Sequence, residues 1–362
     1  MKPRPPLIIP VFLPHLGCPH RCLFCDQRPL SGRPLTAAGP GAVEVAAEIR
    51  AWLARSPAQG RRVEVGFYGG SFTGLPLKEQ GRLLAAVRPF LRAGRVDGIR
   101  LSTRPDYIFP ETPAFLRAHG VETVELGVQS LHPETLRLSR RGHEAWHSEA
   151  AIANLKGAGL KVGAQLMLGL PGECTGSTLA GCRRLAELGP DFVRLHPALV
   201  LTDSGLAALY RQGRYQPLPL VKAVALAARA VEILAVRGIP VIRAGLQTTP
   251  ELEASLVAGP HHPAFGELVK TRVFFNQLRR RLAAFPQRPR QLTVAVRDRS
   301  LLLGRGRDAL RRLEALGLLD QTRIVFAETA GPPRLETIKD VDLWAAGPHN
   351  GAHARRRRSR RH

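Results

Sequence analysis

Three of the chain's five cysteines, Cys18, Cys22 and Cys25, lie within eight residues, in the stretch HLGCPHRCLFCDQ. A thiolate is a strong ligand for soft and borderline metals, so this clustering indicates a metal site. A structural zinc site needs four ligands and usually pairs its cysteines in two CxxC units. Here only Cys22 and Cys25 have that spacing, although His15 or His20 would offer a fourth ligand.

An iron–sulfur cluster is the alternative to zinc. A [4Fe–4S] cluster usually takes four thiolates, so three cysteines would leave one iron open to a ligand from outside the protein. The other two cysteines, Cys174 and Cys182, lie on different predicted segments. The cysteine count is odd, and three of the five cysteines are grouped near the N-terminus. Both features are unlike a secreted disulfide framework. The apolar run near the N-terminus is short and broken by prolines, unlike a signal peptide or a membrane span, and we expect a cytoplasmic protein without membrane contact.

Apolar, β-rich segments alternate with helical patterns, which is typical of a parallel sheet with crossover helices. We expect strands at 7–13, 63–68, 98–102, 121–128, 161–168 and 191–200, with a further strand at 239–246. We expect helices at 42–55, 77–92, 111–119, 144–158, 177–188, 204–212 and 219–237. The pattern then changes to a helix at 267–285, a strand at 291–299, a helix at 308–317 and a strand at 322–328.

This order of elements predicts an α/β fold with a partial (β/α)6 TIM-like barrel and a small C-terminal α+β appendage. The expected domains are a core barrel over 1–250, an α+β domain over 251–344 and a disordered Arg-rich tail over 345–362. In a parallel barrel the loops that follow the strands gather on one face and form the active site. The cysteine loop and the turns GGSFTG, TRPD and GVQS each follow a predicted strand, so we expect them at a common mouth.

The string CPHRCLFC resembles the CxxxCxxC signature of the radical S-adenosylmethionine (SAM) superfamily. The resemblance implies that Cys18, Cys22 and Cys25 hold a [4Fe–4S] cluster whose open iron is chelated by the amino and carboxylate groups of SAM. It also implies that one electron from the cluster cleaves SAM, and that the resulting 5′-deoxyadenosyl radical abstracts hydrogen from a substrate. Such enzymes draw that electron from a reductant protein of the ferredoxin or flavodoxin type.

The same resemblance implies a set of SAM contacts. The string YGGS, Tyr68, Gly69, Gly70 and Ser71, matches the superfamily's Gly-Gly turn that receives the SAM amino group, and Phe24 matches an aromatic residue near the adenine. The remaining candidates lie at strand ends and are Ser102, Arg104, Glu125 and Gln129, of which Arg104 and Gln129 are also the candidate catalytic residues. A guanidinium can grip a carboxylate with two hydrogen bonds, but Arg104 could instead form a loop-fixing ion pair with Asp106.

Three longer strings resemble one branch of the superfamily, namely STRPDYI, VELGVQSLHPETLRLSRRGH and PALVLTDSGLAALYRQGRY. They are similar to the radical-SAM half of the Elongator catalytic subunit, which modifies wobble uridine in tRNA, and to its bacterial relatives. The chain departs from that subunit in its shorter cysteine loop and in showing no acetyltransferase domain.

The net charge of +24 also favours a polyanionic partner, and RNA, in particular tRNA, is the expected substrate. Six of these charges lie in the tail (Arg355–Arg358, Arg360, Arg361). Two alternatives remain open. One is a radical SAM enzyme that acts on a porphyrin or another small molecule, as the oxygen-independent coproporphyrinogen oxidases do. The other is a non-catalytic RNA-binding iron–sulfur protein.

Overall fold

The computed structural model describes residues 5–13, 15–19, 21–26, 39–56, 60–304, 307–329 and 331–338. The predicted Arg-rich tail lies outside these described residues. The chain folds as two compact units, Met1–Gly266 and Glu267–His362. The boundary expected after residue 250 stays a prediction. Within the described residues, no helix combines the length and the apolar character that crossing a membrane would require.

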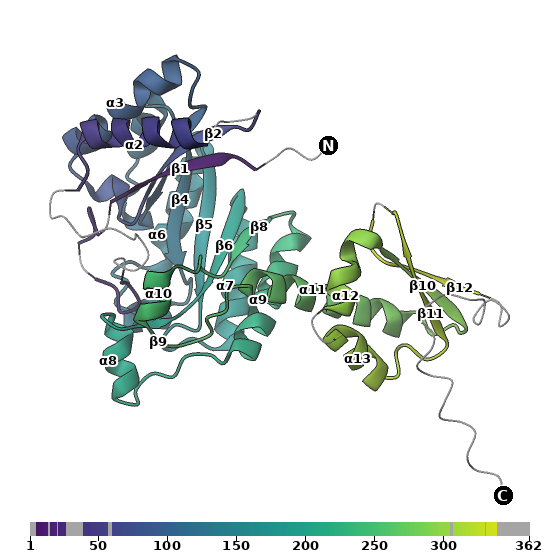
Figure 1. Cartoon of the computed structure of the whole chain (residues 1–362). Coiled ribbons are helices and arrows are strands. Elements are labelled where there is room, and N and C mark those ends of the chain that lie inside the picture. Colours follow the sequence, from purple (N-terminus) through teal and green to yellow (C-terminus); the bar gives the residue numbers. More distant parts are fainter. Residues whose placement is uncertain are drawn as a thin grey trace, which may run out of the picture. The chain divides into compact units, whose positions relative to one another are not determined.

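The first unit is built on one parallel sheet whose strands follow the order β1-β2-β3-β4-β5-β6-β8 (Figure 1). The strands are β1 Leu7–Phe12, β2 Val63–Tyr68, β3 Gly98–Thr103, β4 Val121–Gln129, β5 Lys161–Leu168, β6 Phe192–Pro197 and β8 Val241–Ala244. The main helices are α2 Ala42–Arg55, α3 Leu77–Arg92, α4 Thr112–Ala118, α6 Ala145–Gly157, α7 Thr175–Leu188 and α9 Leu220–Val236. This confirms the predicted α/β class and the partial barrel, with the further strand at 239–246 present as β8.

Burial explains why these segments form central strands. β2 and β5 are buried along most of their length, as expected for a parallel sheet, both of whose faces are covered. Neighbouring strands pair in parallel, so their carboxyl ends lie at one edge. Each crossover is a helix, because parallel strands cannot be joined by a tight turn. The result places the loops after β1, β2, β3 and β4 beside one another.

Several short elements were not expected from the sequence. They are the helices α5 Pro133–Leu138 and α10 Pro250–Ser255, the antiparallel strand pair β7 Val200–Leu201 and β9 Leu256–Ala258, and the 3-10 turns Phe72–Gly74 and Pro105–Tyr107. The helix expected over 204–212 is present as α8 Gly205–Arg211. The prediction of one strand over 191–200 is wrong at its end. β6 stops at Pro197, and Val200–Leu201 forms the separate strand β7, which pairs with β9 instead.

The second unit is a three-stranded sheet with helices. Its elements are α11 Phe265–Ala284, whose first two residues belong to the first unit, β10 Arg290–Ala295, the 3-10 turn Val296–Asp298, α12 Arg299–Leu303, α13 Asp308–Ala315, β11 Thr322–Ala327 and β12 Arg334–Thr337. β10 pairs in parallel with β11 and antiparallel with β12. The strand expected over 291–299 ends at Ala295, because α12 begins at Arg299 and buries Leu302 in the core of this unit.

Candidate functional site

The cysteine loop rests on the loop that follows β2, joined to it by backbone hydrogen bonds. The Leu13 N–H donates to the Tyr68 carbonyl at 2.7 Å, and the His15 N–H donates to the Gly69 carbonyl at 3.0 Å. The Ser71 N–H donates back to the Leu16 carbonyl at 2.8 Å. The two loops are therefore held together backbone to backbone, directly before Cys18.

Glycine is required at this contact because there is no room for a side chain. A Cβ added to Gly70 would lie 2.3 Å from the Leu16 carbonyl oxygen, and one added to Gly17 would lie 2.1 Å from the Ser71 carbonyl oxygen. Gly17 also has a φ of +70°, which favours glycine. The predicted Gly-Gly turn is thus a closely packed backbone support for the cysteine loop.

The three cysteines occupy different degrees of exposure: Cys22 is buried, whereas Cys18 and Cys25 are partly exposed. The Cys25 N–H donates to the Cys22 carbonyl at 3.1 Å, which forms the turn between them. Burial raises the pKa of Cys18, and the nearby guanidinium groups of Arg141 and Arg104 oppose that shift. In the part of the chain that the structure describes, no three His, Cys, Asp or Glu side chains are already grouped as metal ligands.

Arg141 is a buried charged residue that contacts the cysteine loop. Its Nη1 donates to Cys22 Sγ at 3.6 Å, and its Nη2 donates to the Gly127 carbonyl at the end of β4 at 2.8 Å. The same segment is tied to the cysteine loop by the Leu23 N–H, which donates to the Ser139 carbonyl at 3.1 Å. A buried guanidinium therefore links the cysteine loop to β4.

Four buried polar atoms around this loop have no hydrogen-bond partner within the described residues. They are Arg104 Nη1, Ser139 Oγ, Arg141 Nε and His143 Nε2. Because a buried polar atom without a partner is costly, such a group of atoms indicates a place where a polar ligand binds. The three thiols come from a loop without regular secondary structure, so they can converge on a cluster as it binds. The residues present therefore fit a [4Fe–4S] cluster and a polar ligand beside it.

Ser71 and Arg104 belong to a buried hydroxyl cluster at the ends of β2 and β3. Ser71 Oγ lies 3.0 Å from Thr103 Oγ1, which is also 2.6 Å from Thr73 Oγ1, and Ser71 Oγ accepts from the Arg104 N–H at 3.2 Å. The Arg104 guanidinium donates to both carboxylate oxygens of Asp106, at 3.0 and 2.8 Å. The alternative of a loop-fixing ion pair is therefore present, and Arg104 Nη1 has no hydrogen-bond partner among the described residues.

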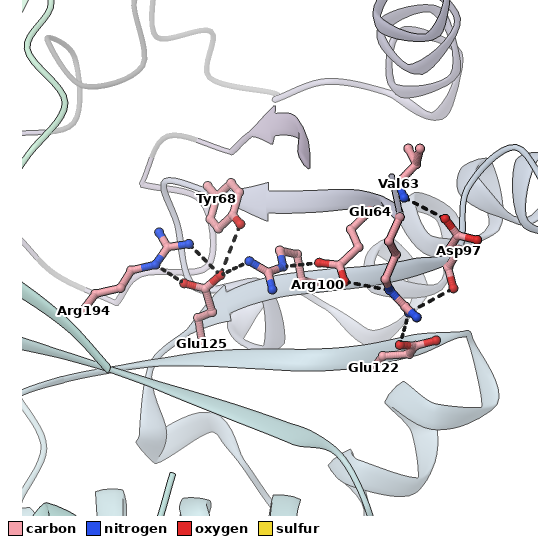
Figure 2. A network of polar contacts seen from close by, with 9 residues as sticks. Val63, Glu64, Tyr68, Asp97, Arg100, Glu122, Glu125 and Arg194 are labelled. Carbon is pink, nitrogen blue, oxygen red and sulfur yellow. Dashed lines mark hydrogen bonds and ion pairs between the residues drawn. The ribbon is translucent and has the colours of Figure 1, made fainter. Parts of the chain in front are cut away.

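A second group of charges lies along the strands of the sheet, and Figure 2 shows it as a chain of contacts. Glu125 accepts hydrogen bonds from Arg194 Nη2 at 3.1 Å, from Arg100 at 3.3 Å and from the Tyr68 hydroxyl at 3.2 Å. Its other carboxylate oxygen lies 2.9 Å from Arg194 Nε as an ion pair. Arg100 also pairs with Glu64 at 2.8 Å. We call these five residues the strand network. Burial and the neighbouring Glu125 raise the pKa of Tyr68 to about 12, so its hydroxyl stays a donor.

The remaining candidates lie near the same strand ends. Gln129 is buried with a φ of +66°, and its Oε1 accepts from Gln165 at 3.2 Å. Ser102 of β3 lies opposite Glu125 of β4 in the backbone register of the sheet. Phe24 packs against Met167, among other residues. The structure thus gives Tyr68, Glu125 and Gln129 internal partners, and their predicted contacts with SAM stay predictions.

Sequence reasoning did not single out Arg141 or Thr103. Arg141 was visible only as part of the string RRGH, which an ordinary polar break between helices would also produce. Its proximity to Cys22 depends on the fold, because 119 residues separate the two. Thr103 stood inside the TRPD turn, where nothing in the sequence distinguished its buried hydroxyl from an exposed one.

Comparison with known protein families gives two matches. The family model described as the radical SAM superfamily matches residues 12–176. The model described as the Radical_SAM C-terminal domain matches residues 190–274. The first match contains the three cysteines and the loops after β2, β3 and β4, and the two matches together span more than half of the chain.

The relatives include an uncharacterized protein of Methanocaldococcus jannaschii, 30% identical over 215 residues, covering 56% of this chain and 64% of that protein. The tRNA uridine(34) acetyltransferase of Methanocaldococcus infernus is 33% identical over 120 residues, covering 32% of this chain and 22% of that one. Human Elongator complex protein 3 is 32% identical over 134 residues, covering 35% of this chain and 24% of that one. The chain thus matches less than two thirds of each relative.

Among solved structures, the archaeal Elp3 of Methanocaldococcus infernus with an N-terminal deletion superposes with a TM-score of 0.56. The two are 22% identical, and the match covers 74% of this chain and 62% of that chain. This similarity shows a shared fold. It agrees with the parallel sheet and crossover helices described above.

Proposed function

Because this chain belongs to the radical SAM superfamily, whose members use a [4Fe–4S] cluster and SAM, we propose that it modifies an RNA, with tRNA as the expected substrate. Cys18, Cys22 and Cys25 would hold the cluster. When bound, the cluster supplies the electron that cleaves SAM into a hydrogen-abstracting radical. A reductant protein of the ferredoxin or flavodoxin type would deliver that electron.

The single observation that carries the proposal is the group of unpartnered buried polar atoms beside the cysteine loop. Arg104 is held by Asp106 with Nη1 still available, so it can donate to a carboxylate such as that of SAM. The Gly69 and Gly70 turn brings backbone next to the cysteine loop, where the SAM amino group would be received. Arg141 would orient Cys22 through its hydrogen bond to the sulfur.

The other predicted SAM contacts have supporting roles in this proposal. Phe24 would line the adenine side, and Ser71 and Ser102 would border the ribose and methionine side. Tyr68, Glu125 and Gln129 would position these groups through the sheet, since the structure already engages their side chains internally.

Two features favour an RNA substrate. The chain carries a net charge of +24, which attracts a polyanion. Several relatives over the radical SAM half are named for tRNA uridine modification. Because those relatives are matched over less than a third of their own length, the tRNA substrate is part of the proposal.

The test is an anaerobic reaction of the reconstituted holoenzyme. The protein is loaded with iron and sulfide, reduced with dithionite and given SAM, and 5′-deoxyadenosine is measured by mass spectrometry with and without tRNA. The tRNA is then digested, and its nucleosides are compared with those of untreated tRNA. We expect 5′-deoxyadenosine in both reactions and an altered nucleoside only where tRNA is present.

The outcomes separate the alternatives. Cleavage of SAM without any change in tRNA, but with a change in a porphyrin, would replace the RNA substrate by a small molecule. An intact four-iron cluster that binds RNA and never cleaves SAM, with or without RNA, would make the protein a non-catalytic iron–sulfur protein. Zinc in place of iron would overturn the proposal.

A further inference from the structure

Three arginines gather near one buried aromatic ring, that of Phe275, in the second unit, and two of them lie over the ring. Arg272, Phe275 and Arg279 are spaced i, i+3 and i+7 on α11, so they share one face of that helix. The guanidinium of Arg312, on α13, lies 4.5 Å from the centre of the Phe275 ring, and that of Arg272 lies 5.9 Å from it. We call Arg272, Arg279 and Arg312 the arginine cluster.

The arginine cluster differs from two neighbouring cations on the same helices, Lys270 on α11 and Arg311 on α13, which have carboxylate partners. Lys270 pairs with Glu267 at 2.7 Å, and Arg311 pairs with Asp308 at 2.8 Å. Within the described part of the chain, no ion pair joins a cluster arginine to a carboxylate. Among the described residues, the positive charges of the arginine cluster are therefore not paired with carboxylates.

Arg272 shows what holding these charges together costs. Its Nε is buried without a hydrogen-bond partner among the described residues. Burial, followed by the nearby charges of Arg312 and Arg279, lowers its pKa. Like charges packed around one aromatic ring repel one another, so the fold keeps an arrangement that an anion would stabilise.

A hollow adjoins the arginine cluster on the same unit. It has a volume of about 340 Å³ and is lined by Arg279, Arg280, Ala283, Leu316 and Leu318. Its lining combines guanidinium groups with apolar side chains. That combination suits a nucleotide, whose phosphate is anionic and whose base and sugar have apolar surfaces.

We propose that the arginine cluster binds the phosphodiester backbone of the RNA substrate, so that the second unit is the RNA-anchoring part of the protein. Arg272 and Arg279 are two helical turns, or about 10 Å, apart along α11, so they reach different phosphates. Guanidinium groups form paired hydrogen bonds with phosphate oxygens, which makes arginine well suited to this role. The inference rests on the proposed RNA substrate and assigns its contact surface.

The test measures binding of the reconstituted full chain to a fluorescently labelled tRNA transcript by anisotropy, over a series of salt concentrations. Arg279→Ala changes an exposed side chain, and Arg312→Ala removes the guanidinium over Phe275. We expect each to raise Kd roughly fivefold near 0.1 M salt and to lower the slope of log K against log salt by about 1. Arg311→Ala is the matched control, because it removes the same charge from α13 at a residue already paired with Asp308.

The arginine cluster is supported when the Arg279→Ala and Arg312→Ala proteins lose affinity and salt sensitivity while the Arg311→Ala protein keeps both. It is overturned when all three variants change equally, since the effect is then net charge alone, or when Arg279→Ala changes nothing. Failure of the wild-type chain to bind RNA also overturns it. Cleavage of SAM by the wild-type holoenzyme tests the proposed activity independently.

Discussion

We call Arg104, Ser139, Arg141 and His143, whose buried side chains lie around the cysteine loop, the cysteine-loop edge. The strand network and the cysteine-loop edge both place charged groups away from solvent, yet they differ in whether these groups have partners. In the strand network, Glu125 lies between Arg100 and Arg194 and also accepts from Tyr68, so each charge meets an opposite charge. At the cysteine-loop edge, Arg104 and Arg141 are held in place by protein acceptors but keep nitrogens without partners.

This difference indicates that the two groups of residues in the first unit have different roles, one in folding and one in binding a ligand. A buried network whose charges are matched stabilises the strands it joins, and removing one member leaves an uncompensated charge. A buried edge with unmet donors lowers stability, and it is retained where a ligand completes it. The strand network is therefore expected to govern folding, and the cysteine-loop edge is expected to govern cofactor binding.

The largest expected effect on activity comes from replacing the cysteines themselves. Replacing any one of Cys18, Cys22 or Cys25 by Ala should abolish the [4Fe–4S] cluster and SAM cleavage, because in the proposed site these three thiolates are the protein's whole contribution to the cluster. Iron content, the visible absorption spectrum and 5′-deoxyadenosine formation would be measured after anaerobic reconstitution. A Cys18→Ala protein with full iron content and full cleavage would remove the basis of the comparison.

The matched control uses the other two cysteines. Cys174 is exposed at the start of α7, and Cys182 is buried within that helix. Cys174→Ala and Cys182→Ala should therefore leave iron content and SAM cleavage unchanged. Loss of the cluster in either protein would mean that the ligand set has been assigned wrongly.

The next effect concerns the strand network. Glu125→Gln would leave the buried guanidinium groups of Arg100 and Arg194 facing a neutral amide, at a cost of about 3 kcal/mol in the free energy of unfolding. Urea unfolding of the first unit, followed by tryptophan fluorescence, measures this cost. Glu122→Gln serves as the control, because Glu122 forms an exposed ion pair with Arg62. This variant should lose less than about 1 kcal/mol in the free energy of unfolding.

A different result for Glu125→Gln would assign Glu125 to the cofactor site instead of the fold. If Glu125→Gln left stability intact but weakened SAM binding more than tenfold, Glu125 would act directly on the cofactor. The strand network would then belong to the site rather than to the fold, and the distinction drawn above would fail.

Arg141 provides the corresponding test at the cysteine-loop edge. Arg141→Ala removes the donor to Cys22 Sγ and should lower SAM cleavage 10- to 100-fold at equal iron content, the range typical of residues that orient metal ligands. Arg137→Ala is the control, because Arg137 is exposed and paired with Glu134 in the same segment. Equal rates for the two variants would show that Arg141 only supports the loop.

The sequence predicted most of the fold because its signals were local. Buried apolar runs such as VEVGFY and KVGAQLML, separated by amphipathic segments, identify central strands and crossover helices without any tertiary information. The errors lie where tertiary context decides. The strand predicted over 291–299 includes Val296–Asp298, which forms a 3-10 turn instead, and burial of Leu302 in the core favours a helix from Arg299.

The site was predictable only in part, for the same reason. Cysteine spacing and the Gly-Gly turn are visible in the sequence, and the structure packs these two loops together. The sequence does not show which partner each charged side chain binds. Whether Arg104 is held by Asp106, and whether Glu125 binds arginines or a ligand, depends on distances between strands that the sequence does not contain.

The smallest expected effect is a pH dependence that originates at the cysteine-loop edge. Burial, helped by the nearby charge of Arg141, lowers the pKa of His143 to about 3, from an ordinary value near 6.5. Below pH 6.5 the unfolded chain therefore takes up a proton that the folded His143 does not. The stability due to the neutral imidazole is fully present above pH 6.5 and is lost as the pH falls, by up to about 1.4 kcal/mol per pH unit.

Thermal unfolding of wild type and His143→Gln between pH 7 and 5 measures this contribution. The variant should lose less stability than wild type on acidification, by about 1 kcal/mol between pH 6 and 5. His196 is a buried histidine of β6 whose pKa is also lowered to about 3 by burial, so His196→Gln serves as a comparison for His143→Gln. If His143→Gln and His196→Gln each flatten the profile, both imidazoles are buried neutral. If only His196→Gln does so, His143 is protonated in the folded protein, and the cysteine-loop edge is more polar than its unpartnered atoms indicate.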